Sequence, residues 1–154
     1  MKSKNYLFAL FIVLLCSCND PFITTDFYGF YTDYRWQKSD VKIFKFKIED
    51  ETKPHDLQFR FRHMYDYQFA EVPINFVIKS PDGKKEAINI QLPIRSLTGE
   101  NYGDCDMDIC DNFYVIKSNT KFKKGTYEVI VSHTFPWPYL PNMIGIGLDL
   151  DKSK

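Results

Sequence analysis

Apolar and polar side chains alternate along most of the chain after residue 40. A period of two is typical of strands that bury one face and expose the other. In residues 44–48, for example, Phe44, Phe46 and Ile48 are separated by lysines. Further runs of this kind occupy residues 57–62, 72–78, 88–94, 127–131 and 144–150, with a weaker one at residues 113–117. We therefore expect about seven short strands.

The same pattern predicts the fold class. No stretch after residue 18 has apolar residues at helical spacing over three turns, and turn sequences such as Ser-Pro-Asp-Gly at residues 80–83 separate the runs. Alternation also argues against a parallel α/β sheet, whose central strands would be apolar on both faces. We expect an all-β fold, a single antiparallel β-sandwich of Ig-like or jelly-roll-like type. Pro93 lacks an amide donor, so its strand either ends there or lies at a sheet edge.

The N-terminus breaks the alternation with an uncharged apolar run at residues 6–16, which follows Lys2 and Lys4. As a helix, this run would be roughly 16 Å long, about half the thickness of a bilayer core. A basic start followed by a short apolar segment and small residues is typical of a secretory signal. We therefore expect residues 1–17 to be a signal peptide rather than a membrane span.

Cys18 makes this signal more specific. Leu15 lies three residues before it and Ser17 directly before it, as in bacterial lipoprotein signals, whereas Cys16 lacks a small preceding residue. We expect lipidation at Cys18, palmitate included, because two acyl chains suffice for stable anchoring. A plain signal peptide cut elsewhere is the alternative.

Residues 18–40 form a segment rich in aromatic residues and without a clear period. This segment is either a tether whose rings dock on the domain or an early edge strand. The β-sandwich domain itself is expected at residues 41–154, with no internal repeat and no second domain boundary.

Charge and motif content exclude several functions. The chain has 20 Lys+Arg and 20 Asp+Glu, scattered rather than clustered, so it offers no footprint for nucleic acid. Its three histidines, His55, His63 and His133, lack zinc-ligand spacing, and no nucleophile elbow or phosphate loop is present. We expect no enzyme and no cofactor. His63 and His133 continue the inward parity of their strands and are expected to be buried with local hydrogen-bond partners.

Two cysteines and three aspartates share one loop. Cys105 and Cys110 are expected to form a disulfide in an oxidising envelope. The alternate carboxylates, residues Asp104, Asp106 and Asp108, are a weak calcium candidate. The glycine and the bidentate glutamate of a calcium loop are missing, so a solvated acidic loop is the favoured interpretation.

The second candidate loop, residues 133–141, holds three prolines and three aromatic residues. Trp137 and Tyr139 could fold back and close the end of the sandwich, which is the interpretation we favour. They could also anchor a protein partner or stack on sugar rings.

Several short blocks of the chain stand in a characteristic order. They are residues 36–40 (Trp-Gln-Lys-Ser-Asp), 52–57, 65–69, 80–84, Gly99, 103–104, 125–129 and 144–148. In these blocks the chain resembles the GldH gliding-motility lipoproteins of the Bacteroidetes. The loop at residues 105–110 is not part of the resemblance, so neither the disulfide nor calcium is implied by it.

The resemblance implies a non-enzymatic lipoprotein of the cell envelope, expected in the outer membrane. It implies a structural or interaction role linked to gliding motility and type IX secretion. The expected partners are the membrane, through the lipid anchor, and other envelope proteins. No catalytic residue follows from it. The residues leave one alternative open, a glycan-binding β-sandwich that uses Trp137 and Tyr139.

Overall fold

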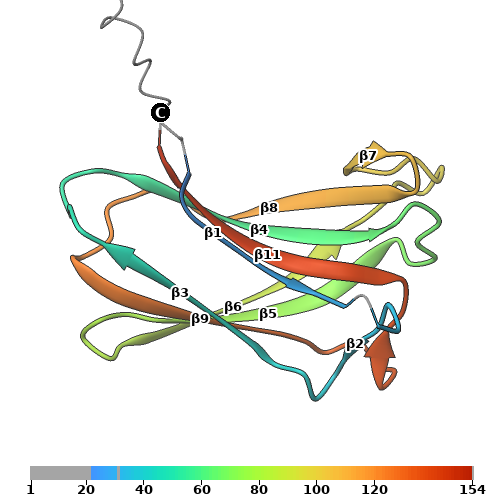
Figure 1. The fold of residues 1–154 in the computed structure, drawn as a ribbon, viewed down its shortest axis with the longest axis horizontal. Coiled ribbons are helices and arrows are strands. Elements are labelled where there is room, and N and C mark those ends of the chain that lie inside the picture. The colour runs from blue at the N-terminus through green and yellow to red at the C-terminus, as the bar shows by residue number, and fades with distance from the viewer. Residues whose placement is uncertain (1–21, 31, 154) are drawn as a thin grey trace, which may run out of the picture.

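The computed structural model describes residues 22–30 and 32–153, which form an antiparallel β-sandwich (Figure 1). One sheet contains, in spatial order, β1 (Phe22–Gly29), β11 (Met143–Lys152), β4 (His55–Met64), β8 (Ile109–Thr120) and β7 (Asp104–Asp106). The opposing sheet contains β3 (Lys42–Ile48), β9 (Gly125–His133), β5 (Glu71–Lys79) and β6 (Lys85–Pro93). A small ribbon pairs β10 (Tyr139–Leu140) with β2 (Trp36–Gln37).

The fold class agrees with the alternating pattern, but the strand count does not. The seven expected strands are β3, β4, β5, β6, β8, β9 and β11, and the described residues contain eleven strands. Three of the additional strands, β2, β7 and β10, have only two or three residues, too few to show a period. The fourth, β1, lies within the aromatic segment, where closely spaced rings hide the alternation.

Of the two interpretations of the segment before residue 41, the described residues form the early edge strand. Strand β1 is an edge strand that pairs with β11 from Phe22↔Asp151 to Gly29↔Gly145. Phe30 and Trp36 lie in the core, and the rings stack with their centroids 5.9 Å apart. These two rings stabilise the sandwich and are not available to a partner.

The core fills the space between the two large sheets with the inward side chains of both. Phe59 of β4 meets Phe76 of β5 edge to face, with ring centroids 5.1 Å apart and both side chains fully buried. Burial of such rings supplies most of the stability of a small β domain, since truncating one to alanine costs about 3–5 kcal/mol. Strand β6 ends at Pro93 and lies at the edge of its sheet, consistent with the missing amide donor.

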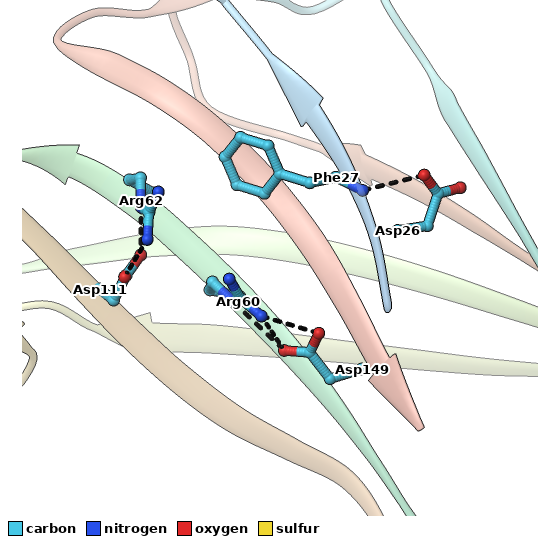
Figure 2. A network of polar contacts seen from close by, with 6 residues as sticks. All are labelled: Asp26, Phe27, Arg60, Arg62, Asp111 and Asp149. Carbon is cyan, nitrogen blue, oxygen red and sulfur yellow. Dashed lines mark hydrogen bonds and ion pairs between the residues drawn. The ribbon is translucent and has the colours of Figure 1, made fainter. Parts of the chain in front are cut away.

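Strand β11 is covered on both faces, which the alternation did not predict. Its outward positions include Gly145 and Gly147, where an added Cβ would lie 2.2 Å and 3.2 Å from ring atoms of Phe27. Figure 2 shows the Phe27 ring above this strand, and the Arg62 guanidinium lies 5.4 Å from the ring centroid. The two glycines therefore leave space for an aromatic ring of β1.

Two arginine–aspartate pairs complete this outer face (Figure 2). Arg60 donates from Nε and Nη2 to the Asp149 carboxylate of β11, and Nη2 lies 2.7 Å from Oδ2. Arg62 binds Asp111 of β8 in the same two-pronged manner, with Nε 2.7 Å from Oδ1. Asp149 is only 1% exposed, and its pairing with Arg60 satisfies a buried carboxylate on an otherwise apolar strand.

Candidate partner-binding surface

The strands give the sandwich two distinct ends. The proximal end is the one at which β1 begins: Phe22 pairs with Asp151 there, and the loops at residues 49–54, 80–84 and 121–124 lie at the same end. Contacts between loops of the two sheets confirm this placement. Lys123 Nζ lies 3.3 Å from Asp82 Oδ2, and the Lys124 amide donates to Glu51 Oε2 at 3.3 Å.

The distal end is formed by the segments at residues 32–38, 65–70, 94–103, 107–108 and 134–142. Its loops expose large apolar side chains. They are Tyr34, Tyr65, Leu97, Tyr102, Met107 and Trp137, with exposed fractions from 41% to 103%. Among the described residues, the three proximal loops expose no large apolar side chain. Exposed apolar groups gathered at one end mark that end as a candidate interaction surface.

A groove of about 440 Å³ opens at the distal end where β4 ends and where β8 and β11 begin. We refer to it as the distal groove. Its apolar walls are Tyr34, Met64, Tyr65, Ile109 and Ile144, and its polar positions are Asp66, Asp108 and Asn142.

Backbone hydrogen bonds hold the walls of the distal groove together. The Tyr65 amide donates to the Asp108 carbonyl at 2.9 Å, which ties the end of β4 to the β7–β8 turn. The Met64 amide donates to the Asn142 carbonyl at 3.0 Å, and the Met143 amide donates to the Tyr34 carbonyl at 2.9 Å. The groove is thus built from segments far apart in sequence and fixed through their main chains.

Non-glycine residues with a left-handed backbone conformation concentrate at this end. Of the four non-glycine residues with positive φ among those described, Tyr34 (53°), Met107 (52°) and Asn142 (55°) lie here. Asparagine tolerates this region, but a tyrosine in it is an outlier, and such residues cost roughly 1–3 kcal/mol each. Strain of this kind persists at ligand clamps. Two of the three residues line the distal groove.

The aromatic loop beside the groove both closes the sandwich and reaches solvent. Phe135 is buried and packs on Phe69, with ring centroids 4.6 Å apart. Trp137 packs edge to face against the same two rings, yet it stays 52% exposed. Tyr139 belongs to β10 and pairs with Gln37. The end-closing role therefore belongs to Phe135, while Trp137 remains accessible.

The β7–β8 hairpin carries the two loop cysteines and the acidic residues. The structure contains a disulfide between Cys105 and Cys110, which are cross-strand partners with Cα atoms 4.1 Å apart. Within residues 22–30 and 32–153, no group of three or more His, Cys, Asp or Glu side chains is placed to hold a metal ion. The structure thus does not assemble Asp104, Asp106 and Asp108 into a calcium site.

The three histidines are buried structural groups. His63 lies between two hydrogen-bond partners, with the Met64 carbonyl and Asn112 Oδ1 each 2.7 Å from a ring nitrogen. His133 lies 3.1 Å from the Trp36 carbonyl, and burial lowers its pKa from the ordinary value. Burial also lowers the pKa of His55, at the other end of the molecule. Desolvation favours the neutral imidazole in both cases.

Sequence reasoning pointed to Trp137 but not to the distal groove. Residues such as Tyr34, Asp66 and Asn142 stand alone between turn residues, and no periodic pattern links them. The lipidation residue Cys18 and the signal peptide at residues 1–17 lie outside the described residues. Within the described part, no helix has the length and apolar character needed to cross a membrane.

The fold and its loops define the class of the protein, an antiparallel β-sandwich domain with apolar side chains exposed at one end. The chain belongs to a family described as GldH lipoprotein, whose model matches residues 26–150. That range covers β1 from Asp26 and nearly all of the sandwich, so the resemblance inferred from the short sequence blocks is confirmed.

Two curated relatives match at similar levels. The gliding motility lipoprotein GldH homolog of Christiangramia forsetii is 25% identical over 127 residues, which is 82% of this chain and 76% of that protein. The gliding motility lipoprotein GldH of Flavobacterium johnsoniae is 25% identical over 130 residues, which is 84% of this chain and 80% of that protein. No solved structure matches the chain.

Proposed function

We propose that this protein is a non-enzymatic envelope lipoprotein that supports gliding motility and its associated type IX secretion machinery through protein–protein contacts. Membership of the GldH lipoprotein family carries the proposal, because the match extends over residues 26–150 and two relatives are named for gliding motility. Burial of all three histidines supports the non-enzymatic part, because these general-base candidates are enclosed in the sandwich.

The proposal places the anchor at Cys18, in the outer membrane. Cys18 precedes the first residue of β1 by four positions, and four extended residues span at most about 14 Å. The proximal end therefore faces the membrane closely, and the distal end points away from it. In this arrangement the exposed apolar loops point away from the membrane, where other envelope proteins can contact them.

Gene deletion with complementation tests this function. We expect the deletion strain to lose gliding and to secrete type IX cargo poorly, and the wild-type gene to restore both. The Cys18→Ala protein should fail to incorporate radiolabelled palmitate, leave the membrane fraction and restore neither. Normal gliding together with normal export in the deletion strain would contradict the proposed role.

A second candidate function is glycan binding, and the exposure of Trp137 favours it. The ring is 52% exposed and is held by Phe69 and Phe135, which gives a rigid flat face suited to stacking on a sugar. Tyr139 lies in the same loop but is covered by Arg35, 4.5 Å from its ring centroid. Binding to a glycan array that is lost in Trp137→Ala would support this function over the first.

A further inference from the structure

We propose that the distal groove receives a basic side chain, lysine or arginine, that projects from a partner protein of the envelope. This inference rests on the proposed function and names the chemistry of the partner. It is carried by three features of the groove: unpaired carboxylates, exposed aromatic walls and a fixed backbone.

The carboxylates of the groove lack internal partners. Asp66 and Asp108 are exposed and line the groove, and neither forms a hydrogen bond or ion pair through its side chain in the described part of the chain. Some exposed acids elsewhere are paired, as Glu49 is with Lys47 and Asp82 is with Lys123. A cationic side chain of a partner could therefore pair with two carboxylates that line one apolar groove.

The walls suit the aliphatic stem that carries such a cation. Tyr34 and Tyr65 expose 41% and 50% of their surface, and Ile144 adds an apolar wall. Lysine and arginine bury their methylene stems on apolar surfaces while keeping the charge at a polar rim, and their charges are attracted to aromatic faces. The molecule itself uses this pairing at Arg35, which lies over the ring of Tyr139.

The surroundings favour a protein over a small cation. Leu97, Tyr102 and Met107 lie in neighbouring distal loops with exposed fractions of 103%, 62% and 89%, and a small ligand in the groove would leave them in water. A protein surface would cover them together with the groove. Aromatic and basic anchors in fixed pockets dominate the energy of such interfaces. Because Tyr34 and Asn142 are held by main-chain hydrogen bonds, the groove needs little rearrangement to bind.

The test uses the full-length lipoprotein in its own cells, with Tyr65 replaced by the photo-cross-linking residue p-benzoylphenylalanine. We expect an adduct with a different protein, mapped by mass spectrometry to a segment that contains lysine or arginine. The yield should fall about tenfold in Asp66→Asn/Asp108→Asn, since close charge pairs couple strongly. It should persist in Asp66→Glu/Asp108→Glu.

The matched control is Asp104→Asn/Asp106→Asn, which removes the same charge from β7, in the hairpin that carries Asp108, but not from the groove. This control should keep the adduct. An undiminished adduct in Asp66→Asn/Asp108→Asn, or an adduct only with a second copy of this chain, would overturn the inference.

A photo-cross-linker at Trp137, at the distal end but outside the groove, separates the inference from the proposed function. Adducts from position 137 without adducts from position 65 would overturn the groove assignment alone. Absence of protein adducts from both positions would count against both.

Discussion

The two ends of the sandwich are built on the same strands but finished in opposite ways. At the proximal end, lysines pair with acids both between loops, as Lys123 does with Asp82, and within one loop, as Lys53 does with Asp50. At the distal end, apolar rings such as Tyr65 and Trp137 reach solvent, and the acids of the groove have no internal partner. The shared core therefore supports one end whose loops form ion pairs and one end whose loops expose apolar rings and unpaired acids.

This difference lies in the loops, because both large sheets run from one end to the other. Loops on a rigid scaffold commonly carry function. If the exposed distal groups serve binding, their substitution should change stability less than substitution of buried groups does.

The largest effect is expected from a buried ring at the distal end. Trp36 is fully buried, stacks with Phe30, and donates from Nε1 to the Asp40 carbonyl at 2.7 Å. Trp36→Ala should lower the free energy of unfolding by about 3–5 kcal/mol, measured by urea denaturation. Trp137→Ala is the matched control at the same end and should cost under about 1 kcal/mol, since that ring is half exposed. Equal losses would show that the exposed ring is structural.

Loss of the hairpin disulfide ranks second. Cys105→Ser/Cys110→Ser should lower the free energy of unfolding by about 2 kcal/mol, because the bridge closes only a short loop. Urea denaturation of the purified protein, with and without reductant, measures this change. Unfolding that is insensitive to both the substitution and the reductant would contradict it.

A pH dependence should come from one histidine at each end. Burial holds the folded-state pKa of His55 and of His133 below the ordinary value near 6.5, so the unfolded chain binds more protons. Their contribution to stability is complete above that value and is lost as the pH falls from it toward the folded-state pKa. Each unit of pKa difference is worth about 1.4 kcal/mol.

Urea midpoints measured between about pH 7.5 and pH 5 should therefore fall on acidification. His55→Gln and His133→Gln should each flatten the profile. A midpoint that rises as the pH falls would show that the protonated imidazole is favoured in the folded state.

The smallest effect on stability is expected from the groove carboxylates. Asp66→Asn/Asp108→Asn should change the free energy of unfolding by less than about 0.5 kcal/mol, since both side chains are exposed and unpaired. Thermal denaturation measures it. A loss of several degrees in melting temperature would indicate that these carboxylates serve the fold instead of a partner.

Sequence reasoning predicted the features that depend on local pattern. Alternation located the strands around Phe59 and Val129 because each buries one face and exposes the other. It did not decide whether the segment that holds β1 is an edge strand or a tether, and it missed the burial of β11 on both faces, which follows only when Phe27 packs over Gly145. Distant partners decide such features, and no single run of residues records them.

The candidate surface shows the same limit. Trp137 stood out because aromatic residues among prolines are recognisable in sequence. The groove did not, because Tyr34, Asp66 and Asn142 meet only after β4 and β11 have paired. The sequence did reveal the family, and the match of residues 26–150 to the GldH lipoproteins confirms it.

The central claim is that the distal end binds a partner while the proximal end faces the membrane. Photo-cross-linking in living cells tests it most directly, with p-benzoylphenylalanine placed singly at distal Leu97 and Trp137 and at proximal Lys53 and Lys84. All four side chains are exposed. We expect adducts with other envelope proteins from the distal positions and none from the proximal ones. Protein adducts from the proximal positions alone, or equally from both ends, would contradict it.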